Sequence, residues 1–420
     1  MIKHIRSWGI VLLLLTAILS ACRPETAQAI SVGSLWDAPA ENGQIDWAAA
    51  SLLAGEANRG FELASQDAAF ESLRFAEGNR QDDVQAAVRQ LAEGQKDTPT
   101  AGPVLALLGA TSNEATARAA ALANFFNLPM IVPSASGDNL LPSNNLWAFQ
   151  LSAPNSTYAR YLLGTVLTAQ ALGGGAEDES APVARIAILY EQNTYGENAA
   201  VAAAEAAMQQ NLEITVYDRF PAENANPTLL RGLANAVIDA DAHIVILISS
   251  DPAAARLLAQ TFKNLLDPRA MPVLVGMAGG FTSQNFLSSP EAEGVTVLRQ
   301  QMQAEGCPAE IQSLYAAQNY AAVKLLAYAV EEAPNLAADR EQLSLASADG
   351  ISAYREAVRD ALKAASLNLP CLGQVAFDNA GQNKFARIEL VTAENGAARV
   401  LSAEELVAAV KQRLAPSTAE

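Results

Sequence analysis

Small hydroxyl and amide side chains follow two apolar runs of the sequence, and side chains of these types bind polar ligands. The run at residues 103–108 predicts a buried strand, and Ser112 and Asn113 come shortly after it. A second run at residues 130–132 leads directly into Pro-Ser-Ala-Ser-Gly at residues 133–137. The two strands would point their carboxyl ends the same way, toward the edge where open parallel sheets bind ligands. The spacing therefore predicts a site for a small polar molecule.

The segment between these runs predicts a helix that begins beside the same edge. Thr111, Ser112 and Asn113 are all helix-capping residue types, and Thr111-x-x-Glu114 fits a capping box. Pro129 cannot continue the helix and ends it. A helix N-terminus offers free N–H groups and the positive end of its dipole to an anion. Capping by itself accounts for Ser112, whereas the two loops together, at this spacing, favour a ligand site.

These two loops resemble those of the periplasmic binding proteins of the Leu/Ile/Val type, the substrate receptors of ABC importers. In that family the loop after the first of these strands, and a P-[SA]-x-[ST] loop after the next, hold the carboxylate and the amine of the ligand. The resemblance implies that the ligand is bound by Ser112, Asn113, Ser134, Ala135 and Ser136.

Further motifs of the same family follow in order along the chain. Residues 58–64 resemble its G-x-E-L-A helix, residues 320–323 its Y-x-A-x helix, and residues 373–381 its G-x-x-x-F-D-x-x-G hairpin. No single motif is specific, but their order extends the resemblance over roughly residues 29–412. It implies an α/β fold of two lobes, each a mostly parallel sheet with helices on both faces, and three chain crossings between the lobes.

The second half of the chain supports this fold, because β-branched apolar runs alternate there with helical patterns. The expected strands are residues 185–190, 213–217, 243–249, 272–276 and 294–298. We place the three crossings near Leu151, Leu298 and Gly373. The lobes then consist of residues 29–151 with 299–372, and of residues 152–298 with 373–412, followed by a tail at 413–420.

In the second lobe, the loops after the strands are expected to cover the ligand. Residues 191–196 resemble the family's D-x-x-Y-G loop, which implies that Tyr195 is a capping aromatic; a tyrosine packed under the loop is the alternative. Ser250 and Asp251 follow the third strand of this lobe. Asp251 before Pro252 predicts first a helix N-cap with proline at N1, and second a ligand contact.

The loop after the fourth strand of this lobe, residues 276–280, contains the candidate ligand-binding residues Met277 and Ala278. The resemblance implies an acidic residue here that holds the ligand ammonium, and Ala278 stands in its place. A desolvated ammonium needs a counter-charge. We therefore expect a small carboxylate or amide as ligand, or that Asp251 or Glu191 supplies the missing charge from a different loop.

The composition favours a large acidic protein and argues against several functions. The 420 residues are 50% apolar and 6% aromatic, and the formal net charge is −18. That length predicts two domains, and the acidic balance argues against nucleic-acid binding, which needs basic patches. Enzyme signatures are missing, and His243 is expected to be structural. We expect no catalysis, no metal and no cofactor.

Residues 1–21 predict a lipoprotein signal peptide. Lys3 and Arg6 precede an apolar stretch that is shorter than the roughly 20 residues of a spanning helix, and Leu-Ser-Ala-Cys at residues 19–22 resembles the bacterial lipoprotein box. We expect lipid on Cys22, a tether over residues 22–28, and an extracytoplasmic protein anchored to a bacterial membrane. An uncleaved anchor or an ordinary signal peptide is the alternative.

Cys307 and Cys371 are the remaining cysteines. In an oxidising compartment they are a candidate disulfide, and two separate buried thiols are the alternative. Because the expected crossings place both residues near the hinge, we predict a disulfide that joins parts of the first lobe.

These patterns predict a monomeric solute receptor that captures a small polar ligand between its lobes and delivers it to an ABC permease. The ligand class is an amino acid, an amide or a small carboxylate. Fold does not decide function, so the alternative is a regulatory envelope lipoprotein that uses the same fold to bind another protein. A collapsed cleft and an exposed apolar patch would favour that alternative.

Overall fold

The computed structural model describes most of the chain after the predicted leader. The described residues are 30–38, 40–41, 44–48, 50–66, 73–78, 84–94, 102–173, 183–221, 226–265, 271–337, 343–345 and 347–415. The predicted signal peptide, the tether with Cys22 and the end of the tail lie outside them. Within the described residues, no helix combines the length and the apolar character that crossing a membrane requires.

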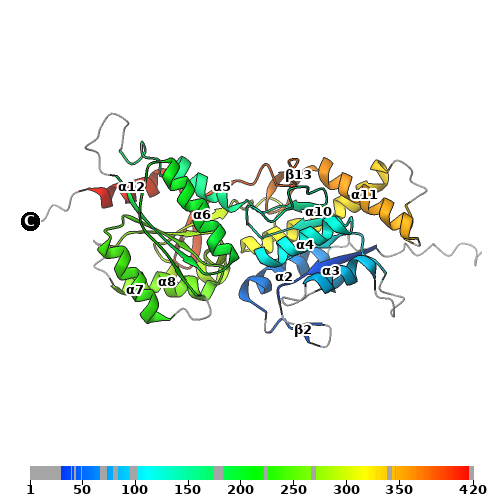
Figure 1. Cartoon of the computed structure of the whole chain (residues 1–420), viewed down its shortest axis with the longest axis horizontal. Coiled ribbons are helices and arrows are strands. Elements are labelled where there is room, and N and C mark those ends of the chain that lie inside the picture. The colour runs from blue at the N-terminus through cyan, green and yellow to red at the C-terminus, as the bar shows by residue number, and fades with distance from the viewer. Residues whose placement is uncertain are drawn as a thin grey trace, which may run out of the picture.

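The chain forms two α/β lobes that lie side by side along the long axis of the molecule (Figure 1). The first lobe contains a five-stranded parallel sheet in the order β4-β1-β5-β6-β7. Its strands are β1 (Ile30–Leu35), β4 (Leu73–Gly78), β5 (Leu107–Leu108), β6 (Met130–Val132) and β7 (Ala148–Gln150). Its helices are α2 (Leu52–Ser65), α3 (Val84–Glu93), α4 (Asn113–Phe125), α10 (Leu314–Leu336) and α11 (Ala348–Ala364).

Helices cover both faces of this first sheet. Helices α2, α10 and α11 pack on one face, and α3 and α4 pack on the other. Side chains of β6 show the alternation of a strand, because Ile131 joins the first of these cores while Met130 and Val132 join the second. The strand is therefore apolar at every position, as expected for a sheet that is buried on both faces.

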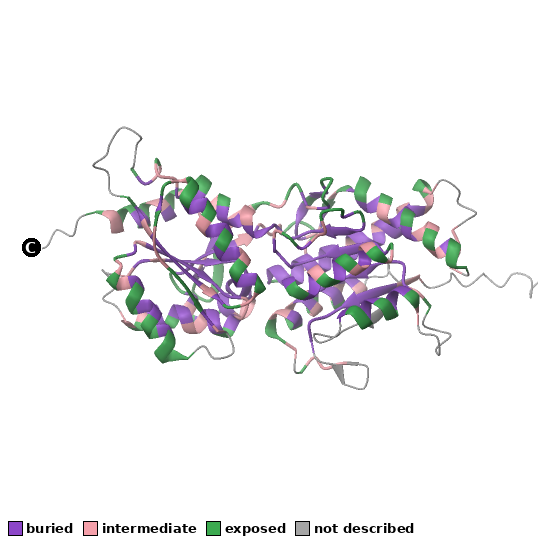
Figure 2. Cartoon of the chain, viewed as in Figure 1, coloured by how far each residue is buried: buried purple, intermediate pink, exposed green. Residues whose placement is uncertain are grey.

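The second lobe contains a seven-stranded mixed sheet in the order β16-β15-β12-β11-β10-β8-β9, in which β15 and β16 are antiparallel. Its strands are β8 (Arg185–Glu191), β9 (Glu213–Phe220), β10 (Ile244–Ile248), β11 (Val273–Met277), β12 (Thr296–Gln300), β15 (Ile388–Glu394) and β16 (Ala397–Leu401). Its helices are α5 (Asn155–Tyr161), α6 (Thr194–Gln209), α7 (Pro227–Asp239), α8 (Pro252–Leu265), α9 (Gln284–Leu287) and α12 (Ala403–Leu414). Figure 2 shows the buried strands of both lobes between helices whose outer faces are exposed.

The predicted α/β class, with two mostly parallel sheets, is confirmed. Some elements differ in length from the expectation. The strand expected over residues 103–108 is limited to β5, and residues before it run beside β1 through single bonds such as Leu105 N to Ser31 O at 2.8 Å. Helix α5 also changes character at its C-terminal end, where it continues as a π-helix at Leu162–Val166.

The three crossings between the lobes are hydrogen-bonded to one another. Gln150 N donates to Gly381 O at 2.8 Å, and Asn383 N donates to Gln150 O at 3.0 Å. Ala153 N donates to the side-chain oxygen of Gln300 at 3.2 Å. These bonds tie the ends of β7 and β12 to the segment that leads into β15, so the crossings form one compact hinge.

The division into lobes at Leu151, Leu298 and Gly373 remains a proposal. The short antiparallel hairpin of β13 (Ser366–Leu369) and β14 (Gly373–Ala376) bears on the third crossing. Val375 and Phe377 belong to the core of the first lobe. We therefore propose to place the third crossing after Phe377.

Cys307 and Cys371 form a disulfide, with their Cα atoms 4.7 Å apart. Cys371 is fully buried in the core of the first lobe, and Cys307 packs against that core. The carbonyl of Cys371 also accepts a hydrogen bond from Gln303 N at 2.8 Å. The disulfide therefore joins the segment after β12 to the β13–β14 hairpin, on the hinge side of the first lobe.

Helices α2 and α10 approach each other closely at Gly60. A Cβ atom on Gly60 would lie 1.9 Å from the carbonyl oxygen of Ala316. Gly60→Ala is therefore expected to force the helices apart and to lower the free energy of unfolding by about 1–3 kcal/mol. Gly55→Ala is the matched control, because a Cβ there meets nothing within 4 Å and raises helix propensity. Denaturant unfolding measures both; equal stability of the two variants would contradict this account of the packing.

Candidate functional site

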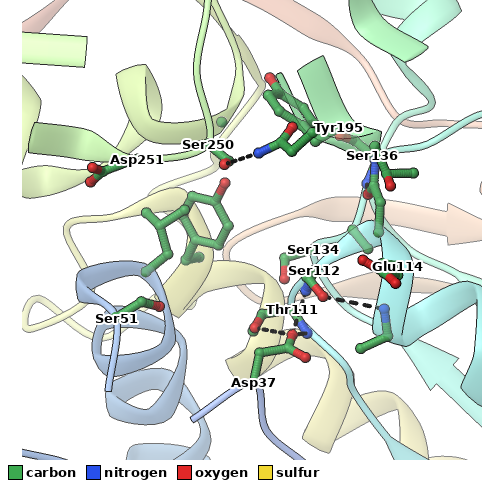
Figure 3. A pocket seen from close by; sticks show the side chains of 18 of the residues that line it. Asp37, Ser51, Thr111, Ser112, Glu114, Ser134, Ser136, Tyr195, Ser250 and Asp251 are labelled. Atoms are coloured by element: carbon green, nitrogen blue, oxygen red, sulfur yellow. Dashed lines mark hydrogen bonds between the residues drawn. The ribbon is translucent and has the colours of Figure 1, made fainter. Parts of the chain in front are cut away.

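A cavity of about 470 Å³ lies between the lobes (Figure 3), in the size range of small-molecule sites. The described residues that line it come from α2, from the N-terminal parts of α3, α4, α6, α8 and α10, and from loops that follow strands of both sheets. In the first lobe they are Asp37, Ser51, Leu52, Leu53, Val84, Thr111, Ser112, Asn113, Glu114, Ala115, Arg118, Ser134, Ala135, Ser136 and Tyr315; in the second they are Asn193, Thr194, Tyr195, Ser250, Asp251, Pro252 and Gly279. The cavity thus brings together all the predicted ligand residues except Met277 and Ala278.

Asp37, just after β1, is a lining residue that sequence reasoning missed. The residue is 9% exposed. One carboxylate oxygen accepts hydrogen bonds from Thr111 N at 2.7 Å, from the Thr111 hydroxyl at 2.6 Å and from Ser112 N. The N–H groups of Thr111 and Ser112, which we expected to be free for a ligand anion, are therefore occupied by a carboxylate of the chain itself.

The next residues along this loop support the loop that follows β6. The Ser112 hydroxyl accepts from Ala115 N at 3.3 Å, so Ser112 is the N-cap of α4. The capping box expected at Thr111 is therefore wrong, and Ala115 at N3 cannot form one with Ser112. The side-chain oxygen of Asn113 accepts from Ser136 N at 3.1 Å and from Gly137 N at 3.2 Å. Asn113 thereby fixes one candidate loop against the other.

The loop after β6 presents one hydroxyl that has no partner. Ser136 donates its hydroxyl hydrogen to Asn155 Oδ1 at 2.9 Å, and the Ala135 carbonyl accepts from the Gln150 side chain at 3.1 Å. The Ser134 hydroxyl and Asn113 Nδ2, by contrast, are buried without a hydrogen-bond partner among the described residues. Buried polar atoms normally find partners, so these two atoms of lining residues have hydrogen-bonding capacity that the described residues leave unused.

In the second lobe, Glu191 holds together the loops that follow β8 and β10. These two loops form the rim of the cavity on this side. Glu191 is 3% exposed and accepts hydrogen bonds from Ser250 N at 2.5 Å, from the Ser249 hydroxyl at 2.9 Å and from Asn193 Nδ2 at 2.5 Å. Asn193 also donates to the Ser250 hydroxyl at 2.9 Å (Figure 3). Glu191 does not line the cavity, so its carboxylate holds the loops together and does not face the ligand.

Tyr195 combines the two roles considered for it. The residue lines the cavity, and its hydroxyl donates to Met277 O at 2.6 Å beneath the loop. Burial raises the pKa of the Tyr195 hydroxyl well above its usual value. The phenol is therefore neutral, and its ring fixes the position of the loop after β11.

Met277 and Ala278 do not line the cavity, contrary to our expectation. The Met277 side chain packs in the core of the second lobe, and Ala278 N donates to Leu298 O at 3.0 Å. Ala278 and Gly279 both have positive φ, at 46° and 54°. This turn brings Gly279 to the cavity, where a Cβ would lie 2.7 Å from the Tyr195 hydroxyl oxygen, so glycine is required there.

Charged side chains around the cavity are mostly acidic. The Asp251 side chain accepts from Ala253 N at 2.9 Å, which caps the start of α8, and Asp251 also lines the cavity. Arg118 is the sole cation among the described lining residues, and it pairs with Glu114 at 2.7 Å on the exposed side of α4. The described residues contain no cluster of His, Cys, Asp and Glu that could hold a metal ion.

Glu56 of α2 connects the two lobes outside this lining. Its carboxylate accepts a hydrogen bond from Asn285 N of α9 at 3.3 Å. Burial raises the pKa of Glu56 above 4.5, although hydrogen bonds from Ser313 and from the backbone of α9 oppose the shift. Folding therefore favours the protonated form of Glu56, a contribution that is fully present below pH 4.5 and is lost as pH rises through the folded-state pKa.

Glu56→Gln is accordingly expected to stabilise the protein at pH 7, because a neutral amide replaces a partly desolvated charge. The gain in Tm over the native protein should shrink as pH falls from 7 toward 4.5, where Glu56 itself becomes neutral. Calorimetric scans across this range measure the difference. Glu62→Gln, at an exposed position of the same helix, is the control and should show no such trend. A gain that stays constant with pH would contradict the role of burial.

The two α/β lobes, each built on a mostly parallel sheet, and the polar cavity between them define a two-lobed ligand-binding protein. The family model described as receptor family ligand binding region matches residues 69–394. The chain therefore belongs to this family, whose members bind ligands and are not enzymes, in agreement with the sequence-based expectation. A comparison with curated protein sequences finds no match.

Solved structures share the fold at low sequence identity. The chain is similar to the leucine-binding protein LivK from Thermotoga maritima, with 11% identity, a TM-score of 0.67, and coverage of 89% of this chain and 98% of that one. It is similar to an ABC transporter substrate-binding protein from Desulfitobacterium hafniense in complex with leucine (18%, 0.61, 89% and 100%). It is also similar to a solute-binding protein from R. palustris in complex with benzoate (16%, 0.65, 89% and 96%). These likenesses show the periplasmic-binding-protein type I fold that the sequence predicted.

Proposed function

We propose that this protein is the extracytoplasmic solute receptor of an ABC importer and captures a small polar ligand between its lobes. The observation that carries the proposal is the cavity itself, since side chains of both lobes line it and the buried Ser134 hydroxyl lacks a partner. The structural relatives named above, one bound to leucine and one to benzoate, support the same use of the fold. The ligand class is an amino acid, an amide or a small carboxylate.

In this proposal, the ligand acts by favouring the closed arrangement of the lobes. A ligand that contacts both lobes binds the closed form more tightly and shifts the equilibrium toward it. The closed, monomeric receptor then docks on its permease.

Lipid on Cys22 would hold the receptor at a bacterial membrane. Cys22→Ala should therefore abolish lipid labelling of the protein, and labelling that persists in this variant would contradict the lipid anchor.

A thermal-shift screen of the purified protein tests the binding function. Amino acids, amides and small carboxylates are the panel, because a ligand that binds only the folded state raises Tm. For a solute that binds, Ser134→Ala should weaken affinity by about tenfold, as expected for one lost hydrogen bond in a buried site. Ser289→Ala is the matched control, because Ser289 is equally buried at 8% exposure but lies outside the cavity lining.

Equal affinity of the two serine variants would contradict the assignment of the cavity as the binding site. The alternative function, a regulatory lipoprotein that binds another protein, would be favoured by a collapsed cleft. The volume between the lobes favours the receptor. Failure of the whole panel to raise Tm would count against the receptor and for the alternative.

A further inference from the structure

One position of the cavity is already filled by an anion that belongs to the chain. Asp37 accepts hydrogen bonds from Thr111 N and the Thr111 hydroxyl, at 2.7 and 2.6 Å, and from Ser112 N. Figure 3 shows its carboxylate directly against these two residues. They stand at the start of the 13-residue helix α4, whose dipole places partial positive charge at this end. The arrangement is that of an anion site occupied by a side chain.

This occupancy disfavours a ligand carboxylate at the same end of the cavity. Thr111 N and Ser112 N already donate to Asp37 and are not free to donate to a ligand. A ligand carboxylate would also lie beside the buried Asp37 carboxylate, and two like charges in one partly desolvated site repel. A polar group without negative charge meets no such penalty.

The other charges of the cavity point the same way. Asp251 adds a second acidic group from the second lobe. Arg118, the sole cation of the described lining, is paired with Glu114 at 2.7 Å, and both side chains are more than half exposed. Among the described lining residues, none offers an unpaired positive charge to an anionic ligand.

The hydrogen-bonding groups that remain suit an uncharged or cationic ligand. The Ser134 hydroxyl belongs to a residue that is 8% exposed, has no partner, and can either donate or accept. Asn113 Nδ2, also buried and without a partner, donates only. Asp251 lines the cavity from the second lobe, and one of its carboxylate oxygens accepts from Ala253 N, so the other can accept from an N–H group. A carbonyl oxygen facing Asn113 and Ser134 and a nitrogen facing Asp251 would satisfy all three.

From these contacts we infer that the ligand is a small amide or amine that carries no carboxylate, and that Asp37 occupies the position of a ligand anion. This inference rests on the proposed receptor function and narrows its ligand class. It also excludes the small carboxylate that the sequence analysis named as one of the expected ligands.

Matched pairs of acid and amide test the ligand class in the native protein. The members of each pair differ in the carboxylate charge that Asp37 is expected to exclude. The pairs are leucine with leucinamide, benzoate with benzamide, and propionate with propionamide. For any pair that binds, calorimetry should give at least about tenfold tighter binding of the amide. Tighter binding of the acid would overturn the inference while supporting the proposed receptor function. Binding of neither member of any pair would count against that function, and the test of Asp37 that follows would still decide the inference.

Substitution of Asp37 tests the occupied anion position without any knowledge of the ligand. In Asp37→Ala the N–H groups of Thr111 and Ser112 lose their acceptor, so sodium acetate should raise Tm more in the variant than in the native protein. Acetamide and sodium chloride are the controls and should show no such difference. Asp37→Asn keeps the shape of the side chain and is read in the same way where Asp37→Ala does not fold. Equal effects of acetate on native and variant proteins would overturn the assignment of Asp37.

Discussion

Replacing Cys307 and Cys371 together by alanine is expected to lower the free energy of unfolding by roughly 4 kcal/mol in the chain-entropy model. The disulfide joins residues 64 apart in sequence, so it restricts a long loop of the unfolded chain. The Cα separation of 4.7 Å lies within the usual range, and both residues contact the core of one lobe. The bond is therefore expected to stabilise that lobe without restraining the movement of the other.

Urea unfolding of the oxidised protein measures this loss. Dithiothreitol treatment of the native protein should reproduce it, and Cys307→Ala alone should cost about as much as the double substitution, because either change removes the same bond. Neither cysteine lines the cavity, so the affinity of any solute identified in the screen should remain unchanged. A double variant within about 1 kcal/mol of the native protein would contradict the prediction.

The sequence predicted the elements whose patterns are local. Strand β10 is an unbroken apolar run, Ile244–Ile248, and every residue of it is buried. Helix α8 begins with the Asp-Pro pair that was expected to start it. Strand β16, Ala397–Leu401, was not predicted, because it is an edge strand with almost every residue exposed. It therefore lacks the alternation of apolar and polar residues on which a strand prediction depends.

The candidate site was predictable where loops follow strands and not where partners are distant. The paired loops at Ser112 and Ser134 line one cavity, as their spacing suggested. Asp37 was missed because an acidic residue after a strand reads as an ordinary turn residue. Its hydrogen-bond partners lie 74 and 75 residues further along the chain. Its position after a first-lobe strand, at the edge where Ser112 was expected, was the available signal.

In the loop after β11, the backbone conformation brings to the cavity a different residue from the one that the sequence indicated. The family motif pointed to Ala278, but the left-handed conformation of Ala278 and Gly279 turns the chain so that Gly279 reaches the cavity. A sequence pattern identifies the loop, whereas the φ angles of two residues decide which of them faces the ligand. The absence of an acidic side chain at this point, which the sequence did indicate, is unaffected by the shift of one residue.

Glu191→Ala is expected to destabilise the second lobe by about 3–5 kcal/mol, because it removes the buried acceptor that holds the rim. In addition to Ser249 and Asn193, the Ser250 hydroxyl donates to Glu191 at 2.9 Å, and Asp251 N donates at 3.3 Å. Without the carboxylate these buried and partly buried donors lose their partner, and each group that is left buried and unsatisfied costs about 1–3 kcal/mol. Because Ser250 and Asp251 are part of the cavity lining, binding of any identified solute should be lost as well.

Asp251→Asn provides the matched comparison. Substitution of Glu191 tests the stability of the rim, whereas substitution of Asp251 tests the charge of the cavity. Asp251 is partly exposed and lines the cavity, so its substitution should change the free energy of unfolding by no more than about 0.5 kcal/mol. It should nevertheless weaken binding of a cationic solute, because it removes an acidic side chain of a residue that lines the cavity. Urea unfolding and calorimetry on both variants distinguish the two roles. If Glu191→Ala kept native stability while abolishing binding, Glu191 and not Asp251 would be the counter-charge of the ligand.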